Sequence, residues 1–289
     1  MNALPVRRTA AHRERLDAFM AEVLRQHARA RRDPEAEAIH DLRVALRRCL
    51  SISGPMRRLD AIDDWPAMHR SGRRLFRRLG RLRDLQVQAA WVRHFDPEGG
   101  TWPRLGRSLA SEEDAARAQA QAAIERWRRR RWERWAAELP ARLDRLNGEP
   151  VFLLRLAIVQ LGRAQALHRL PLGGDRSYHQ LRIELKRFRY FLEAFLPAQH
   201  GAFLAELKNV QDLLGEAHDL DALEDRLTLQ AEGGSGRRHQ RGLALIAAAR
   251  QERFAAYAAL SEGSEEPLWP RWRAELLAEL ARSDDSSSI

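Results

Sequence analysis

The sequence contains a single cysteine, Cys49, among 289 residues. One thiol cannot form a disulfide within the chain, which excludes the small secreted domains that depend on several disulfides. No run approaches the roughly 18 uninterrupted apolar residues that indicate a membrane-spanning helix, and the N-terminus has no apolar signal-peptide segment. We therefore expect a cytoplasmic protein without a membrane partner, in which Cys49 is a small core residue.

Lysine is nearly absent as well. Only Lys186 and Lys208 occur among the 50 lysines and arginines, which exceed the 40 Asp and Glu residues and give a formal charge of +10. A basic surplus of this size predicts an anionic partner without identifying it. A G+C-rich genome would explain the arginine bias, and so would selection for guanidinium groups, which bind phosphate oxygens two at a time.

Sequence signatures of common catalysts are missing. No two of the ten histidines lie within four residues of each other, so no helical pair is spaced to chelate a metal ion. The chain has no Walker loop and no G-x-S-x-G nucleophile motif. The doublets His40-Asp41 and His218-Asp219 keep a metal-dependent phosphohydrolase as the least favoured alternative. We expect a binding protein, not an enzyme, with no catalytic residues, metal ligands or cofactors.

Strand-like alternation is scarce, whereas Ala, Leu, Arg and Glu recur at helical spacing along nearly the whole chain. This pattern predicts an all-α protein with four or five helices in each half. We place the boundary at the Asn147-Gly148 turn, which gives halves of residues 1–148 and 149–289. The expected helices span residues 9–31, 34–53, 66–96, 101–139, 151–170, 177–196, 201–231, 237–261 and 267–282.

Two of these helices share a cationic pattern. Each has a histidine followed by basic residues at i+3 and i+7, which lie on one face of a helix. The two sets are His40, Arg43 and Arg47, and His179, Arg182 and Lys186, offset by 139 residues. Each helix is followed by an L-G-x-x-[RH]-D segment, at residues 79–84 and 214–219. Duplication of both motifs indicates an internal repeat.

The two H-x-x-R-x-x-x-[RK]-R helices and their L-G-x-x-[RH]-D segments resemble the CHAD domain, the conserved histidine α-helical domain, over about residues 9–282. The resemblance implies two pseudo-symmetric helical bundles that flank a basic central channel, and it implies that inorganic polyphosphate binds there. Such binding would also place the protein on polyphosphate granules.

The resemblance further implies phosphate-binding residues in each half. The first set is His40, Arg43, Arg47, Arg48, Arg73, Arg77 and Arg83. The second set is His179, Arg182, Lys186, Arg187, Arg189, Lys208 and His218. His218 stands where the first repeat has Arg83, and this departure predicts a weaker or pH-dependent contact.

Two arginine-rich stretches keep nucleic acid open as the alternative partner. Seven arginines between residues 70 and 83 repel one another unless an anion or neighbouring carboxylates lie beside them. Residues 126–135 mix arginines with three tryptophans, a composition that suits base stacking by single-stranded nucleic acid. The interpretation that we favour is that these tryptophans are partly buried anchors with arginines over their faces.

Overall fold

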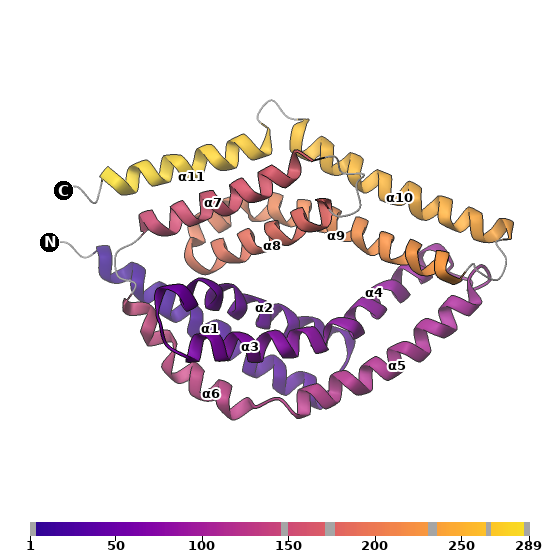
Figure 1. Cartoon of the computed structure of the whole chain (residues 1–289), viewed down its shortest axis with the longest axis horizontal. Coiled ribbons are helices and arrows are strands. Elements are labelled where there is room, and N and C mark those ends of the chain that lie inside the picture. The colour runs from indigo at the N-terminus through magenta and orange to yellow at the C-terminus, as the bar shows by residue number, and fades with distance from the viewer. Residues whose placement is uncertain (1–3, 146–149, 171–176, 231–235, 264–266, 286–289) are drawn as a thin grey trace. The chain divides into compact units, whose positions relative to one another are not determined.

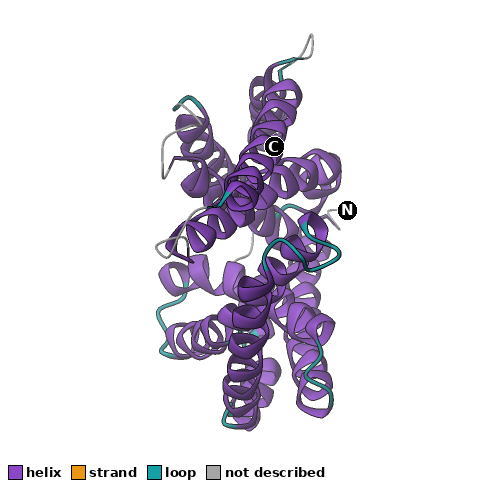
Figure 2. Ribbon diagram, turned by 90° about the vertical axis from the view of Figure 1, so that its right-hand side faces the viewer, coloured by secondary structure: helices purple, strands orange, loops and turns teal. Residues whose placement is uncertain are grey.

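A computed structural model describes residues 4–145, 150–170, 177–230, 236–263 and 267–285. These residues form eleven α-helices and one short 3-10 helix, and no β-strand occurs among them (Figure 2). The predicted all-α class is therefore confirmed. The predicted turn at Asn147-Gly148 lies outside the described residues.

The chain divides into two compact units. The first unit comprises Met1–Gln86, Glu112–Glu149 and Glu193–Phe195, and the second comprises Val87–Ser111, Pro150–Leu192 and Leu196–Ile289. The helices of the N-terminal half are α1 (Leu4–Arg32), α2 (Ala36–Leu59), α3 (Asp64–Arg78), α4 (Gly80–Phe95), α5 (Pro103–Glu125), α6 (Arg129–Glu138) and the 3-10 helix η1 (Pro140–Arg145). Those of the C-terminal half are α7 (Pro150–His168), α8 (Ser177–Phe195), α9 (Pro197–Gln230), α10 (Arg237–Glu262) and α11 (Leu268–Asp285) (Figure 1). The division of the sequence at residue 148 stays a prediction.

Helices α1 and α9 begin at Leu4 and Pro197, before the predicted starts at residues 9 and 201. Three further differences from the predicted helices have a physical explanation, and the first concerns Pro55. The expected helix over residues 34–53 continues through Pro55 to Leu59. Proline removes one backbone N–H from the helix, which usually ends or kinks it. Here Ile52 and Met56 are both buried on either side of the proline, so tertiary packing holds the last turn in place.

The other two errors are helices that the structure interrupts. The expected helix over 66–96 is split at Leu79 into α3 and α4. Arg43 Nη1 donates a hydrogen bond to the Phe76 carbonyl oxygen over 2.8 Å, and a side chain inserted into the backbone ladder is a known cause of a helix break. The expected helix over 101–139 is split into α5 and α6, where the Trp127 ring packs beside the rings of His27, 4.6 Å away, and Trp132, 5.0 Å away.

The core of the first unit contains the tryptophans of the Arg/Trp-rich stretch. Trp132 and Trp135 are fully buried, and their Nε1 groups donate to Ser71 Oγ over 3.0 Å and to Asp64 Oδ1 over 2.8 Å. The Arg131 guanidinium lies 4.9 Å from the centre of the Trp135 ring. Two of the three tryptophans are therefore core anchors, and their rings are not available to stack on bases.

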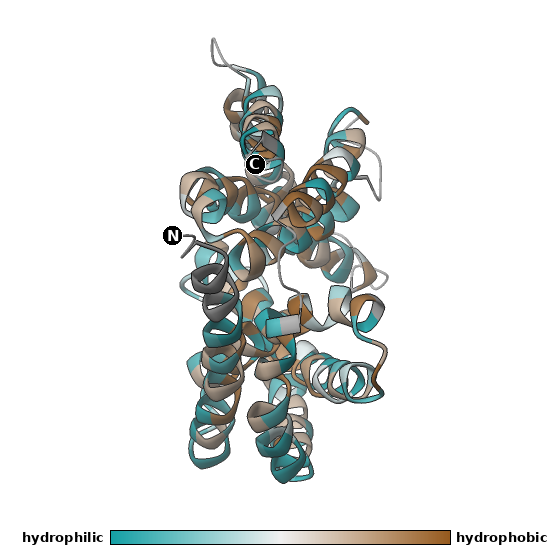
Figure 3. Ribbon diagram, turned by 90° about the vertical axis from the view of Figure 1, so that its left-hand side faces the viewer, coloured by the Kyte–Doolittle hydropathy of each residue, from teal (hydrophilic) through white to brown (hydrophobic). Residues whose placement is uncertain are grey.

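The helices of the second unit mix hydrophilic and hydrophobic residues along their length (Figure 3). On α8 the buried stripe is Leu181, Leu185, Phe188 and Leu192. From α9, the Gln211 side chain donates to the Leu185 carbonyl oxygen over 3.0 Å, which fixes α9 against this stripe. This pairing of α8 with α9 brings the polar residues beside the stripe close together. None of the described helices combines the length and apolarity required to cross a bilayer.

Candidate anion-binding sites

Four residues of the first unit make up what we call the first cluster: His40, Arg43, Arg47 and Arg83. Helix α2 places the first three on one face, at i, i+3 and i+7. Arg83 comes from α4, and its charge acts on both His40 and Arg43. The structure therefore joins the two sequence motifs of the first half, which are separated by about forty residues, at one site.

Arg43 is the anchored member of the first cluster. Besides its hydrogen bond to Phe76, its guanidinium lies 4.2 Å from the centre of the Phe76 ring, and that of Arg47 lies 5.2 Å from the same ring. Burial, together with the neighbouring charges of Arg47 and Arg83, lowers the pKa of Arg43 to about 10. Arg43 still carries its charge at neutral pH, so the cluster holds concentrated positive potential in the absence of an anion.

His40 responds to the same potential. Burial and the charge of Arg83 lower the pKa of its imidazole, while Asp41 opposes them. The Asp41 carboxylate is itself bound by Arg29 over 2.7 Å. The imidazole of His40 is therefore mostly neutral near pH 7 until an anion approaches.

The other predicted residues of the first half fall into two kinds. Arg73 and Arg77 are exposed on α3, and the described part of the chain offers neither of them a carboxylate partner. Arg48 has contacts of its own: its Nε is 2.7 Å from Glu193 Oε1, and its guanidinium lies 5.8 Å from the centre of the Phe19 ring. The structure therefore gives Arg48 a packing and ion-pair role.

Four residues of the second unit form the second cluster: His179, Arg182, Lys186 and His218. Helix α8 supplies the first three at i, i+3 and i+7, and α9 supplies His218. The ring centroids of His179 and His218 are 4.4 Å apart, with an angle of 46° between the ring planes. A histidine from the second motif thus touches the histidine of the first motif.

Both imidazoles are held in the neutral form. Burial, followed by the charges of Arg182, His179 and Lys186, lowers the pKa of His218 to about 4. Burial and the charges of Arg182 and Lys186 also lower the pKa of His179. His179 Nδ1 is buried and has no hydrogen-bond partner among the described residues, and a donor or acceptor left in this state is costly.

The remaining predicted residues of the second half lie outside this cluster. Arg187 is exposed and forms an ion pair with Glu184 of its own helix. Arg189 lies 4.8 Å from the centre of the Tyr190 ring and donates to the Tyr190 hydroxyl over 3.1 Å. Lys208 is exposed on α9.

Helices α3 and α9 differ sharply in charge when they are compared at the predicted register of the repeat, an offset of 135 residues. Six exposed or partly exposed positions of α3 and the start of α4 are Arg70, Arg73, Arg74, Arg77, Arg78 and Arg81. The corresponding positions of α9 are Ala205, Lys208, Asn209, Asp212, Leu213 and Glu216. Only one of the six cations is matched, so the first unit has the larger cationic surface.

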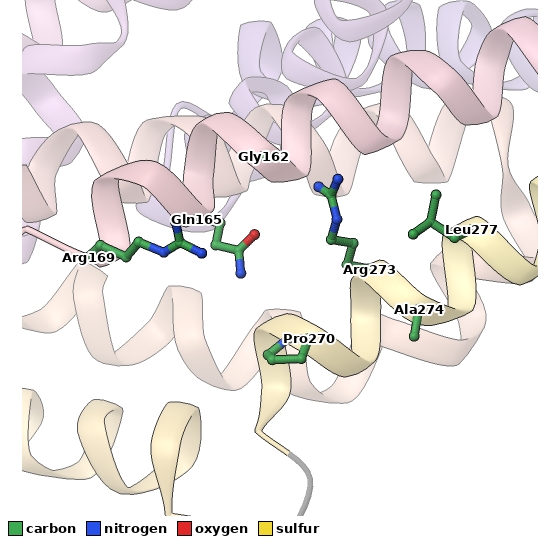
Figure 4. A pocket seen from close by; sticks show the side chains of 7 residues that line it. All are labelled: Gly162, Gln165, Arg169, Pro270, Arg273, Ala274 and Leu277. Atoms are coloured by element: carbon green, nitrogen blue, oxygen red, sulfur yellow. The ribbon is translucent and has the colours of Figure 1, made fainter.

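A separate groove lies between α7 and α11 of the second unit. It has a volume of about 610 Å³ and is lined by Gln165 of α7, by Arg169 just after the end of α7, and by Pro270, Arg273 and Leu277 of α11, among others (Figure 4). None of the predicted phosphate-binding residues lines it. The described residues contain no group of three or more His, Cys, Asp or Glu side chains that could hold a metal ion.

Sequence reasoning missed Phe76 and Gly80. The Phe76 ring and carbonyl hold two arginines of the first cluster, and a Cβ atom on Gly80 would lie 3.2 Å from Arg43 Nη1. Phe76 is the only aromatic residue between Arg70 and Arg83, and its place among these arginines could have indicated a cation–π contact.

Comparisons with a family model and with solved structures agree with this architecture. The CHAD domain family model matches residues 14–228. The crystal structure of the CHAD domain from the plant Ricinus communis has a TM-score of 0.61 at 22% identity, covering 94% of this chain and 92% of that one. The structure of PptA from Streptomyces chartreusis has a TM-score of 0.61 at 18% identity, covering 86% of this chain and 95% of that one. No curated protein matches the chain. Because the family match extends over most of its length, the chain belongs to the CHAD domain family.

Proposed function

We propose that the protein binds inorganic polyphosphate through the first and second clusters, and that it does so without turning the polymer over. One observation supports this proposal above the others. In each unit, a basic or histidine residue of the L-G-x-x-[RH]-D segment adjoins the cationic face of the histidine helix: Arg83 beside His40, and His218 beside His179. The resemblance of both motifs to those of the CHAD family supports polyphosphate as the anion.

The chemistry of the first cluster suits a phosphate chain. Guanidinium groups donate parallel hydrogen bonds to phosphate oxygens, and such charge-assisted bonds are about twice as strong as neutral ones. The contacts of Arg43 and Arg47 with Phe76 hold their guanidiniums in place before the ligand arrives, which lowers the ordering cost of binding. Counterions released from the polymer add a further favourable and salt-dependent contribution.

Nucleic acid is the competing ligand class. The exposed arginines of α3 would attract any polyanion, whereas the burial of Trp132 and Trp135 removes the aromatic surface that base stacking requires. A competition experiment separates the two. Labelled long-chain polyphosphate, bound to the full chain at physiological salt, should resist excess RNA or DNA, and its affinity should fall steeply as salt rises. Equal displacement by RNA would favour the nucleic-acid function.

Neighbouring arginines of α2 provide matched variants for the same assay. Arg47→Gln should weaken polyphosphate binding about tenfold, because a charge-assisted contact contributes roughly 1.4 kcal/mol or more. Arg48→Gln should weaken it much less, since that guanidinium is engaged by Glu193. A double change of Arg169→Gln and Arg273→Gln removes two charges from the α7–α11 groove and controls for net charge. If all three variants weaken binding equally, attraction is nonspecific.

The absence of catalysis is part of the proposal. Orthophosphate release from polyphosphate should remain at the background rate whether divalent ions are added or chelated. Metal-dependent turnover would overturn the claim of a binding module. Attachment to polyphosphate granules follows from the same affinity, and the Arg47→Gln variant should reduce it.

A further inference from the structure

We propose that the second cluster takes up protons when it binds phosphate, with His179 and His218 as the groups that receive them, so that its share of polyphosphate binding grows as the pH falls. This inference rests on the proposed function and adds proton dependence to it. The two clusters would then differ in kind: the first holds a permanent charge at Arg83, and the second has a titratable group at the corresponding position.

The geometry places two proton acceptors at one point. Ring centroids 4.4 Å apart put the imidazoles of His179 and His218 in van der Waals contact, one from α8 and one from α9. Arg182 and Lys186 lie on the same face of α8 and act electrostatically on both rings. One phosphate group that approaches Arg182 and Lys186 therefore also approaches the two imidazoles.

Without an anion, this arrangement opposes protonation. Protonated His179 and His218 would add two positive charges to those of Arg182 and Lys186 in a partly buried site. This is why burial and the neighbouring cations lower the pKa of His218 to about 4. At neutral pH the unoccupied cluster therefore holds two charges and two neutral rings.

The other charged groups of these helices do not offset the positive charge beside His179 and His218. Besides Arg182 and Lys186, the charged residues closest to the pair along α8 and α9 include Glu184, Arg187, Glu216 and Asp219, and α10 adds Arg250 and Arg253, which bind carboxylates of α9. Glu184 is paired with Arg187, and Glu216 with Arg253 over 2.9 Å. Arg250 is bound by Asp221 and Glu224 of α9. Asp219 follows His218 directly in the chain, and it is not among the groups that shift the pKa of that imidazole.

Bound phosphate reverses the balance. Its negative charge favours the imidazolium form, and an imidazolium donates from both ring nitrogens, whereas a neutral imidazole offers one donor and one lone pair that repels phosphate oxygens. The pKa of both histidines therefore rises on binding, and the complex holds more protons than the free protein. By linkage, each proton taken up changes the affinity by at most about tenfold per pH unit.

The direction in which affinity changes with pH follows from these pKa shifts. Affinity rises as the pH falls through the raised pKa of the bound form, and it levels off below the pKa of the free form. For His218 the free form has a pKa of about 4, so mildly acidic pH lies above the lower end of this range. In the first cluster only His40 can add a proton, because Arg83 is charged throughout.

The test uses the full chain and labelled long-chain polyphosphate at constant ionic strength. Between about pH 8 and pH 6, affinity should increase by at least roughly threefold, and by at most about a hundredfold for each proton taken up, since each proton contributes at most tenfold per pH unit. Calorimetry in two buffers of different ionisation enthalpy should detect net proton uptake on binding. Interior phosphates of a long chain keep one charge each over this range, so the ligand contributes little to the change of affinity with pH.

Variants assign the effect to its residues. His218→Arg introduces the residue that the first repeat has at the corresponding position. It should raise affinity at about pH 8 and remove most of the dependence of affinity on pH. His218→Gln should reduce the dependence of affinity on pH without raising affinity at about pH 8, because one of the two proton acceptors of the second cluster is then missing. It decides the matter if the arginine variant does not fold. His94→Gln is the matched control, because His94 is exposed and its ring packs against Trp91 and Phe95 of its own helix.

The outcomes separate this inference from the function on which it rests. The proton coupling is overturned if polyphosphate binds without proton uptake, or if a folded His218→Gln variant keeps the same dependence of affinity on pH. Either result leaves polyphosphate binding intact. Failure of the wild-type chain to bind polyphosphate at any pH overturns both.

Discussion

At the scale of single residues, most histidines of this protein lose basicity in the folded state. Six of them have pKa values below the ordinary value, and burial is the leading cause for each: His27, His40, His69, His168, His179 and His218. Nearby arginine or lysine charges add to the effect at all six. The folded state therefore resists protonation at sites that the unfolded chain protonates freely.

This property predicts acid sensitivity of the free protein. An unfolded histidine takes up a proton near pH 6.5, while folded His218 does so only at about 4. Between these values the unfolded state binds more protons, so stability is fully present above about pH 6.5 and declines as the pH falls. Thermal unfolding without ligand should show a lower Tm at about pH 5.5 than at pH 7.5, and His218→Gln should reduce this difference.

Polyphosphate provides the control for that prediction. Because the bound form is expected to hold the added protons, saturating polymer should reduce the loss of Tm in acid. An identical loss in wild type and His218→Gln would contradict the assignment to His218, and it would direct attention to the buried His27, which contacts the Ile124 carbonyl oxygen over 2.9 Å.

At the scale of elements, the two halves differ at the L-G-x-x-[RH]-D segment: the helix of the first half is interrupted at Leu79, whereas α9 is continuous. Helix α9 runs without interruption past Gly215, whereas the corresponding Gly80 begins α4 immediately after the break. A Cβ atom on Gly80 would meet Arg43 Nη1 at 3.2 Å, and one on Gly215 would meet nothing within 4 Å. The two glycines occupy the same motif position with different surroundings.

This difference predicts opposite results from one substitution. Gly215→Ala should stabilise the protein by up to about 1 kcal/mol, since alanine favours the helix and no side chain is displaced. Gly80→Ala should gain less stability or lose some, and it should weaken polyphosphate binding, because the guanidinium of Arg43 must move away from the Phe76 carbonyl. Denaturant unfolding and binding of both variants test this. Equal effects on affinity would show that the position of Arg43 does not matter.

The existence of most helices could be predicted from sequence, but their interruptions could not. Apolar periodicity identifies the stripe of α8, and all four of its residues are buried. The breaks arise from distant contacts: Arg43 reaches the Phe76 carbonyl 33 residues later, and His27 meets Trp127 across a hundred residues. No local pattern specifies such contacts.

The candidate site shows the same limit. Spacing alone placed His40, Arg43 and Arg47 on one face of a helix, as the structure has them. The ion pair of Arg48 with Glu193 joins residues 145 positions apart in sequence, so no local pattern indicates it. Contact between His179 and His218 likewise requires knowing how α8 packs on α9.

At the scale of the whole molecule, positive charge is distributed unequally between the two units. The arginines on the outer face of α3 have one cationic counterpart on α9, Lys208. The second cluster also lacks a permanent charge at His218. At pH values above neutrality, the first unit is therefore expected to supply most of the attraction for a polyanion.

Paired variants test this inequality. Arg47→Gln with Arg83→Gln removes two charges from the first cluster but leaves the structural contacts of Arg43 in place, and Arg182→Gln with Lys186→Gln removes two from the second. Near pH 8 the first pair should weaken long-chain binding more than the second. The gap should narrow at about pH 6, where His179 and His218 contribute. Thermal unfolding without ligand should change little in either, because like charges held together oppose folding.

Polymer length then distinguishes one shared binding event from two separate ones. A chain that occupies both clusters gains from effective concentration, because its second contact is intramolecular. Under the shared arrangement that the CHAD resemblance implies, each pair of substitutions should reduce the affinity of a long chain well beyond its effect on a short oligophosphate. The short ligand should stay bound by the intact cluster, and its stoichiometry on the wild-type chain should be two, against one for either double variant. If long and short chains lose affinity in the same proportion in both variants, the clusters act independently, and a single channel for the polymer is the wrong description.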